Sequence, residues 1–172
     1  MDSKERIAAA LKVATDTKVF EMAQGILPIV PDVFKKLFPG RKAVVVADIN
    51  TWPAAGEAVY GYLTAAGIPT AKYIIDKEEF HAEWRYIEMT DAILDGDLAK
   101  ANFIENDPCY TETEASKTFR LAGEDYYVAV SVGAGVINDC CKLASHHHGQ
   151  GYICVATAAS VDGFSSFGAS IH

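Results

Sequence analysis

The chain has 172 residues, half of them hydrophobic, which is enough for one domain with a sizeable buried core. Its formal net charge of −8 comes from 23 acidic and 15 basic residues, and this excess of acid argues against nucleic-acid binding, which needs clustered positive charge. There is no apolar run of membrane-spanning length and no apolar leader after Met1, so we expect a cytoplasmic protein with no membrane partner. The four cysteines lack the paired spacing of a zinc site, and we expect buried or half-buried thiols.

The first 40 residues are predicted to be a helical lead-in to an α/β domain at residues 41–172. Residues 3–14 have the composition of a helix, and Pro31 can open a second, shorter helix over residues 33–38. We assign no chemistry to this lead-in.

A βαβ unit begins the main domain. The apolar residues 43–47 predict a strand, a helix follows from about residue 51 to residue 66, and residues 71–75 predict a second strand. A right-handed crossover is expected, so the two strands should be parallel.

Asp48 stands at the carboxyl end of the first predicted strand. A carboxylate there can accept hydrogen bonds from the ribose hydroxyls of an adenosine. A solvated aspartate or an Asx turn with Asn50 fits the sequence equally well. In the usual Rossmann order the acid follows the glycine turn by about 20 residues, whereas here it comes first, which argues against an ordinary Rossmann dehydrogenase. Facing an adenosine, the carboxylate would repel a 2′-phosphate and favour NAD over NADP.

The middle of the chain gives weaker signals. Residues 78–100 are predicted to be mostly helical, with the buried positions Trp84, Ile87, Ile93 and Leu94. Residues 103–125 have no clear period, so we expect a surface insertion or flexible loop there, with a short helix over residues 113–122.

The last third predicts a strand at residues 128–132, a glycine turn, a helix over residues 136–147 and a strand at residues 152–156. Gly133 and Gly135 let a ligand approach the main chain, and the start of the following helix favours an anion such as a phosphate. A tight turn without a ligand remains the alternative, because Asn138 replaces the third glycine of the GxGxxG fingerprint.

A second polar turn follows the last predicted strand. Thr157 and Ser160 offer hydroxyls there, and Asp162 offers a carboxylate. Neighbouring parallel strands would bring both turns to one edge of the sheet, where open α/β proteins bind their ligands. The three consecutive residues His146, His147 and His148 are not assigned to a metal, because successive helical side chains point about 100° apart.

The two turns together resemble the glycerol-1-phosphate dehydrogenase family, which belongs to a superfamily with glycerol dehydrogenase, iron-containing alcohol dehydrogenases and dehydroquinate synthase. The resemblance lies in VSVGAGVINDCCKLA and in YICVATAASVDGFSSFGASI. The family's GGGxxxD turn appears as residues 133–139, with Ala134 for the middle glycine, and its TAxSxDG turn as residues 157–163. This resemblance implies a Rossmann-like parallel sheet with helices on both faces, and we expect the chain to lack the family's C-terminal helical domain.

Site residues follow from the same resemblance. The pyrophosphate of NAD(P) would lie on the first turn, the nicotinamide side on the second, and Asp162 would reach the hydroxyls of the substrate. The cofactor-binding residues so implied are Asp48, Gly133, Ala134, Gly135, Val136, Ile137, Thr157, Ala158, Ala159, Ser160 and Ser166.

The resemblance implies the NAD(P)-binding domain of an oxidoreductase that interconverts dihydroxyacetone phosphate and sn-glycerol 1-phosphate. We expect this chain alone to be catalytically incomplete, because the family's zinc ligands, one aspartate and two histidines, would lie beyond His172. No catalytic and no metal-binding residue is therefore assigned. A dinucleotide is the expected partner, joined in a full-length protein by zinc and a small phosphorylated polyol, and a homo-oligomer stays open.

Two alternatives remain. The chain could come from a glycerol dehydrogenase or a dehydroquinate synthase-like member of the same superfamily. It could also be a non-catalytic nucleotide-binding or interaction module.

Overall fold

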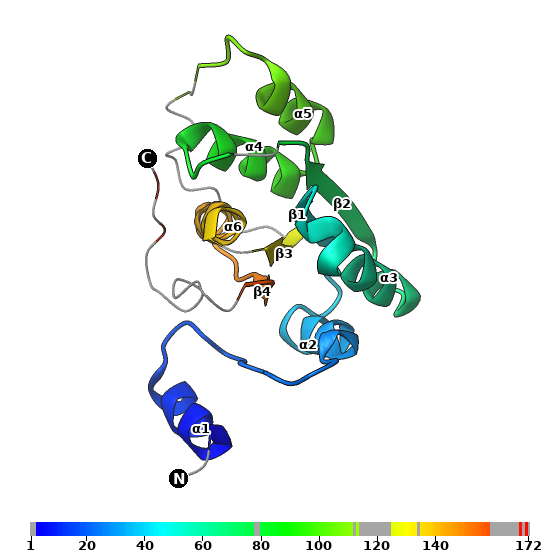
Figure 1. Ribbon diagram of the computed structural model, residues 1–172, viewed down its shortest axis with the longest axis vertical. Helices are drawn as coiled ribbons and strands as arrows, with labels where there is room; N and C mark the ends of the chain where they lie inside the picture. The colour runs from blue at the N-terminus through cyan, green and yellow to red at the C-terminus, as the bar shows by residue number, and fades with distance from the viewer. Residues whose placement is uncertain are drawn as a thin grey trace.

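The computed structural model describes residues 3–77, 80–111, 113, 125–133, 135–158, 169 and 171. They contain a four-stranded sheet made of β1 (Ala43–Asp48), β2 (Thr70–Ile75), β3 (Val128–Gly133) and β4 (Ile153–Ala156). The strand order is β2-β1-β3-β4, and each neighbouring pair is parallel. Helices lie on both faces of this sheet (Figure 1), which confirms the expected Rossmann-like α/β class.

The two central strands are apolar along their length because both of their faces are covered. Along β1, alternate side chains enter different cores: Val45 packs in one and Val44 in the other. Every residue of β3 is buried, so this strand carries no side chain that faces solvent.

One face of the sheet is covered by α2 (Val30–Leu37) and α3 (Glu57–Ala65), with a short 3-10 turn, η1 (Leu27–Ile29), before α2. Phe34 of α2 and Leu63 of α3 are buried in one cluster with Val45 and Val130. Apolar side chains from two helices thus seal this face of the central strands.

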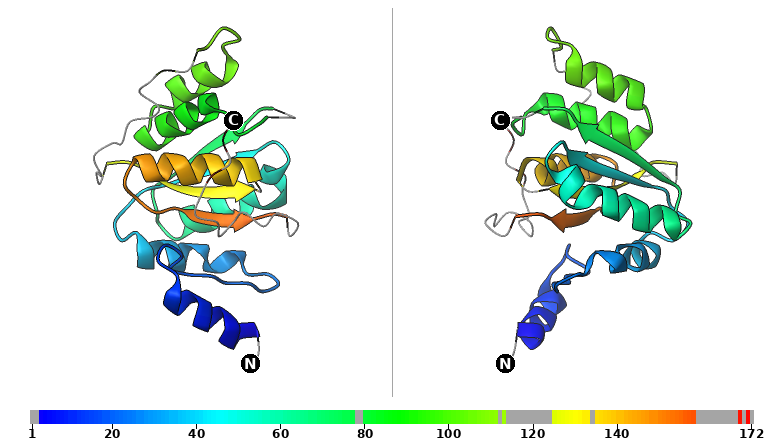
Figure 2. Two further views of the ribbon diagram at one scale, coloured as in Figure 1. Left: turned by 90° about the vertical axis from the view of Figure 1, so that its left-hand side faces the viewer. Right: turned by 45° about the vertical axis from the view of Figure 1, so that its right-hand side comes forward.

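The opposite face is covered by α4 (Trp84–Asp95), α5 (Leu98–Asn106) and α6 (Gly135–His147), as Figure 2 shows. Met89, Ile104 and Ile137 are members of its core, one from each helix. Of the predicted buried positions in α4, Ile87, Ile93 and Leu94 are fully buried, whereas Trp84 is only half-buried.

The predicted helical stretch over residues 78–100 is in fact two helices. Gly96 has a φ of 84°, a left-handed conformation that ends α4, and the Asp97 side chain then accepts a hydrogen bond from the Lys100 N–H at 3.0 Å. A glycine followed by a capping aspartate therefore restarts the helix in a new direction.

The expected surface loop from residue 103 is also wrong at its start, because α5 continues to Asn106 and buries Ile104 and Glu105. The Arg85 side chain stabilises the end of α5, where its Nε donates to the Ile104 carbonyl at 2.8 Å. Most of the predicted helix at residues 113–122 lies outside the described residues.

The N-terminal helix α1 (Ser3–Val13) agrees with the helix predicted over residues 3–14 and stands away from the sheet (Figure 2). Val13 at its end is 82% exposed. By contrast, α2 packs into the sheet core through Phe34. The division of the chain at residue 40 stays a prediction.

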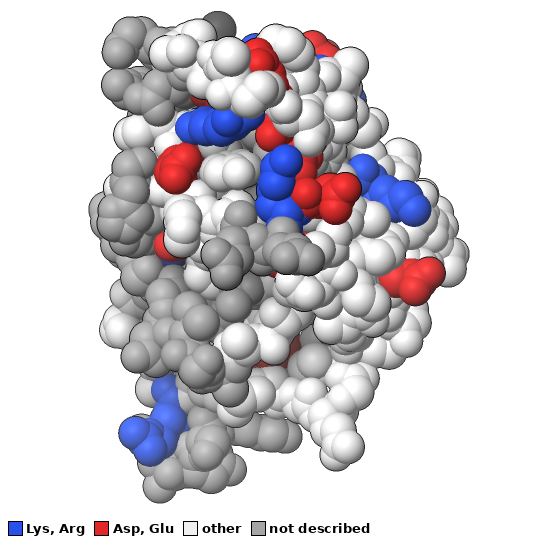
Figure 3. Space-filling view, turned by 45° about the horizontal axis from the view of Figure 1, so that its top comes forward, with Lys and Arg blue, Asp and Glu red and all other residues white. Residues whose placement is uncertain are grey.

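The surface carries charges of both signs. On the face in Figure 3, the basic and acidic side chains that are drawn lie next to one another rather than in a single basic patch. Within the described residues, no helix is long and apolar enough to cross a membrane.

Candidate functional site

The strand order creates a switch point between β1 and β3. The chain leaves β1 for β2 on one side and later returns to β3 on the other, so the connections diverge at the carboxyl ends of these two strands. Ligands of open α/β sheets bind at such a point. Asp48 ends β1 and Gly133 ends β3, so two of the predicted site residues stand at this edge.

The second predicted turn reaches the same edge. Gly133 of β3 pairs with Ala156 of β4, and the Thr157 N–H donates to the Gly133 carbonyl at 3.4 Å. Thr157 is exposed and Ala158 is half-buried. The described start of the second turn therefore lies next to the end of β3, as the sequence predicts from parallel pairing.

Gly133 is required by packing inside the protein. A Cβ at this position would lie 2.7 Å from Cδ1 and 3.1 Å from Cβ of Ile137, in the first turn of α6. Such distances are too short for carbon atoms, so only glycine lets α6 start this close to β3.

Gly135 is different, because no contact among the described residues requires a glycine there. Apart from its chain neighbours and the backbone of its own helix, no atom of the described residues lies within 4 Å of the position that its Cβ would occupy, and Gly135 is not among the positive-φ glycines of the described part. Gly135 begins the 13-residue helix α6, whose first N–H groups lack helical acceptors and carry a partial positive charge. The turn thus presents open space next to a helix terminus that favours an anion.

The next residues of the glycine turn are partly or fully buried. Val136 is half-buried, and Ile137 is buried beneath Gly133. Asn138, in the position of a third fingerprint glycine, is 1% exposed and its Oδ1 accepts a hydrogen bond from the Tyr152 hydroxyl at 2.8 Å. Beyond Gly135, this turn therefore offers a ligand its backbone rather than its side chains.

Asp48 forms the Asx turn that the sequence left as an alternative. Its Oδ1 accepts hydrogen bonds from the N–H groups of Asn50 at 2.8 Å and Thr51 at 2.7 Å. In return, the Asp48 N–H donates to Thr51 Oγ1 at 3.0 Å. The carboxylate is half-buried and is held in one orientation by its own turn.

A π-helical segment, η2 (Trp52–Gly56), follows this turn and leads into α3, where the sequence predicted a regular helix. A Cβ on Gly56 would lie 2.8 Å from the Trp52 ring, so the indole packs directly on the glycine backbone. Single π turns inside helices occur frequently at functional sites. Sequence periodicity does not distinguish such a turn from an ordinary helical one.

Several predicted site residues cannot be placed. The cofactor residues Ala134, Ala159, Ser160 and Ser166 and the substrate residue Asp162 lie outside the described residues.

Two buried carboxylates were not singled out by the sequence. Glu105 of α5 accepts hydrogen bonds from the Tyr73 hydroxyl at 2.6 Å and from the Asp76 N–H at 2.8 Å, which fixes the end of β2. Burial, together with the hydrogen bond to Glu105, raises the pKa of Tyr73 far above its usual range. Glu88 of α4 accepts hydrogen bonds from the Tyr110 hydroxyl and from Thr113.

The histidines at the end of α6 form a buried polar cluster with α4. His147 Nδ1 lies 3.2 Å from Asp91 Oδ2, and His148 Nε2 lies 2.9 Å from Asp95 Oδ1. His148 is fully buried, whereas His146 is exposed. Within the part of the chain that is described, no three His, Cys, Asp or Glu side chains are grouped so that they could hold a metal ion.

The cysteines are free thiols, as expected, although Cys109 is exposed rather than buried. Burial raises the pKa of the Cys140 thiol to about 12 and that of Cys141 well above its usual value. These thiols stay protonated near neutral pH, so they are poor nucleophiles.

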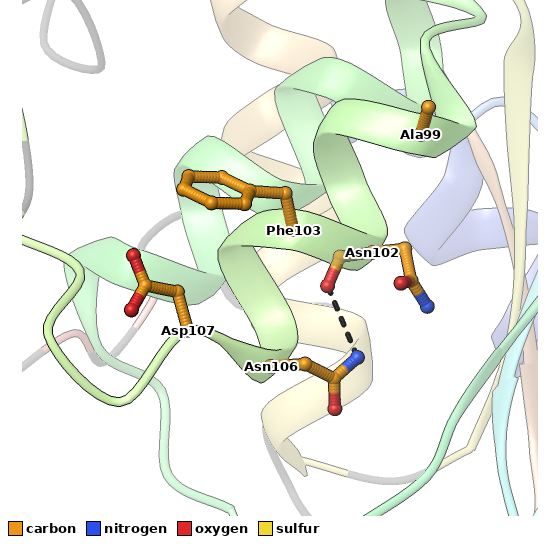
Figure 4. A pocket seen from close by; sticks show the side chains of 5 residues that line it. All are labelled: Ala99, Asn102, Phe103, Asn106 and Asp107. Atoms are coloured by element: carbon orange, nitrogen blue, oxygen red, sulfur yellow. Dashed lines mark hydrogen bonds between the residues drawn. The ribbon is translucent and has the colours of Figure 1, made fainter.

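A shallow depression lies on the outer surface of α5, away from the two turns. Its volume is about 450 Å³, and its lining residues all come from α5 and the residue after it (Figure 4): Ala99, Asn102, Phe103, Asn106 and Asp107. It contains none of the predicted site residues.

Comparison with known proteins shows what this chain is similar to. Residues 89–172 match the family model described as iron-containing alcohol dehydrogenase. The chain is similar to the glycerol-1-phosphate dehydrogenase [NAD(P)+] of Bacillus velezensis, with 34% identity over 128 residues. It is also similar to the glycerol-1-phosphate dehydrogenase [NAD(P)+] of Halalkalibacterium halodurans, with 30% identity over 127 residues.

Each alignment covers 74% of this chain but 26% of the relative, so the chain matches about a quarter of the length of these proteins. The family match includes the glycine turn, α6 and β4, the same segments from which the resemblance was drawn. The family match over residues 89–172 and the two relatives therefore confirm the resemblance of this chain to the iron-containing alcohol dehydrogenases and to the glycerol-1-phosphate dehydrogenases.

Proposed function

We propose that this chain binds NAD(P) at the carboxyl edge of β1, β3 and β4, as the nucleotide-binding part of an oxidoreductase that acts on a small phosphorylated polyol. The observation that carries the proposal is the open space at Gly135, where the described residues give no packing reason for a glycine. A diphosphate that approaches the main chain supplies that reason, because a side chain at residue 135 would occupy its place.

The described residues at this edge fit a dinucleotide. Backbone N–H groups at the start of α6 would hold the pyrophosphate, Asp48 would face the adenosine ribose, and Thr157 would lie on the nicotinamide side. Ile137 would contribute only its backbone, since its side chain is in the core. When bound, the nicotinamide supplies the site that accepts or donates a hydride.

The substrate part of the proposal follows from the names of the relatives, which are glycerol-1-phosphate dehydrogenases. The reaction would interconvert dihydroxyacetone phosphate and glycerol 1-phosphate. A zinc ion is proposed only for a longer protein, because no residue of this chain is assigned as a metal ligand.

A titration of the chain with NAD⁺, followed by tryptophan fluorescence, tests the proposal. Trp52 follows the Asp48 turn directly, so a ligand at this edge should change its emission. We expect saturable binding that is lost in Gly135→Val, because the added side chain fills the space for the diphosphate.

Gly61→Val is the matched control. A Cβ at Gly61 also meets nothing within 4 Å, and this residue is exposed in the middle of α3. The control should bind NAD⁺ like the native chain. If the native chain shows no saturable signal at millimolar NAD⁺, or if Gly135→Val binds equally well, the proposal is wrong and an interaction module becomes the better interpretation.

A further inference from the structure

The turn after β1 is closed by three hydrogen bonds among Asp48, Asn50 and Thr51. Thr51 takes part in two of them: its N–H donates to Asp48 Oδ1 at 2.7 Å, and its Oγ1 accepts from the Asp48 N–H at 3.0 Å. The third joins the Asn50 N–H to the same Oδ1 at 2.8 Å. Thr51 thus binds both the backbone and the side chain of Asp48.

This arrangement limits how the Asp48 carboxylate can move. Rotation about its Cα–Cβ bond would break two hydrogen bonds from N–H groups to a charged acceptor, which are among the stronger ones in proteins. Asp48 Oδ2 accepts no hydrogen bond from the described residues, so this oxygen remains available to a ligand.

The charges around the Asp48 carboxylate add to the electrostatic repulsion that a second anion would meet there. Asp48 pairs with Ile75 across the sheet, so Asp76 places another carboxylate-bearing residue at the end of the adjacent strand. The two lysines in β2 and just after it have other partners: Lys72 Nζ lies 5.0 Å from the centre of the Trp52 ring, and Lys77 Nζ donates to Asn106 Oδ1 at 3.4 Å. Among the described residues, no lysine or arginine forms an ion pair with Asp48.

We propose that Thr51 is a positioning residue for cofactor specificity: by holding Asp48 in place, it makes the site select NAD over NADP. A ribose 2′-hydroxyl can donate a hydrogen bond to the free Oδ2 of Asp48. The 2′-phosphate of NADP is instead repelled by this carboxylate, because the hydrogen bonds of the turn prevent the Asp48 side chain from rotating away. The inference rests on the proposed dinucleotide site and adds a residue that acts through Asp48 rather than on the ligand.

Dissociation constants for NAD⁺ and NADP⁺, measured by titration of the same chain, test it. The native chain should bind NAD⁺ at least about tenfold more tightly than NADP⁺. Thr51→Val keeps the N–H and removes the hydroxyl acceptor, so it frees the backbone of Asp48 and should lower this preference several-fold. Thr51→Ser keeps the hydroxyl and should retain the native preference.

Asp48→Asn supplies the second comparison, because the amide oxygen can still accept from both N–H groups but carries no charge. This variant should bind NAD⁺ and NADP⁺ with nearly equal affinity. A thermal melt of each variant shows whether it is folded, and the ratio of the two dissociation constants does not change merely because a variant is less stable.

The outcomes separate this inference from the proposed function. Tight NAD⁺ binding with an unchanged preference in Thr51→Val overturns the role of Thr51 and leaves the dinucleotide site standing. Equal affinity of the native chain for the two cofactors also overturns it. Failure of the native chain to bind either cofactor overturns the proposed function itself.

Discussion

At the scale of single residues, Gly133 and Gly135 lie two positions apart but have different surroundings. Gly133 is needed because Ile137 lies where its Cβ would be, whereas Gly135 faces open space. The sequence motif treats both as parts of one glycine turn. Only the contacts distinguish Gly133, which is needed for packing, from Gly135, which faces open space.

This contrast gives a prediction. Gly133→Ala should lower the free energy of unfolding by roughly 1–3 kcal/mol, because it overpacks the contact with Ile137. Gly135→Ala should leave stability unchanged or slightly higher, since alanine favours a helix, and yet should weaken NAD⁺ binding. Urea unfolding and cofactor titration of both variants check this, and equal losses of stability would contradict it.

The role of some other residues could not be predicted from the sequence pattern. Glu105 is an ordinary helical acid until Tyr73, 32 positions earlier, and Asp76 are brought against it. The position of Asp48 at the end of a strand could be predicted from the sequence. Its hydrogen bonds with Thr51 could not, because they depend on the local geometry of the turn.

At the scale of elements, the strands were the most predictable part. β1 and β3 are unbroken apolar runs because helices cover both faces, and their predicted bounds differ from those observed by one residue at the carboxyl end. The part of α5 beyond residue 100 was not predicted, because this helix buries only a narrow stripe that includes the acid Glu105. Hydrophobic periodicity does not report a buried carboxylate whose partners are distant in the chain.

The contact between α4 and α6 gives a second prediction. His148→Ala should lower the free energy of unfolding by on the order of 3 kcal/mol, because Asp95 and the buried Asp91 lose a partner in the interior. Asp95→Asn should cost less, since an amide oxygen can still accept from His148 Nε2 and Asp95 is partly exposed. Chemical unfolding of the two variants decides this, and a native midpoint for His148→Ala would contradict it.

At the scale of the whole molecule, the predicted parallel sheet brings the starts of both turns, at Gly133 and Thr157, to one edge, and that step needed only strand order and handedness. The sequence could not show that histidines at the C-terminal end of α6 contact aspartates of α4. Consecutive histidines carry no pattern that reveals a partner more than 50 residues away.

A third prediction concerns alkaline pH. Burial raises the pKa of Cys140 from 9.0 to about 12, and also raises the pKa values of Cys141 and Cys154. Unfolded thiols lose their protons above about pH 8.5, whereas the folded ones keep them, so the unfolded chain gains stability as the pH rises. The contribution of these thiols to the free energy of unfolding should be constant through neutral pH. The free energy of unfolding should then fall from about pH 9 upward.

Urea unfolding at several pH values between neutral and about pH 10.5 measures this slope. Cys140→Ala removes one of the groups and should make the slope shallower. A free energy of unfolding that stays level or rises over this range would show that the buried thiols do not control alkaline stability.

The measurement that tests the account most directly is amide NMR mapping of a titration with NAD⁺. We predict that the largest shift changes come from the amides of Gly135 and Ile137, from Thr51 and from Thr157, which share the carboxyl edge of the sheet. If the largest changes instead surround Asn102 and Asn106 at the α5 depression, or if the edge residues do not respond, the proposed site is contradicted.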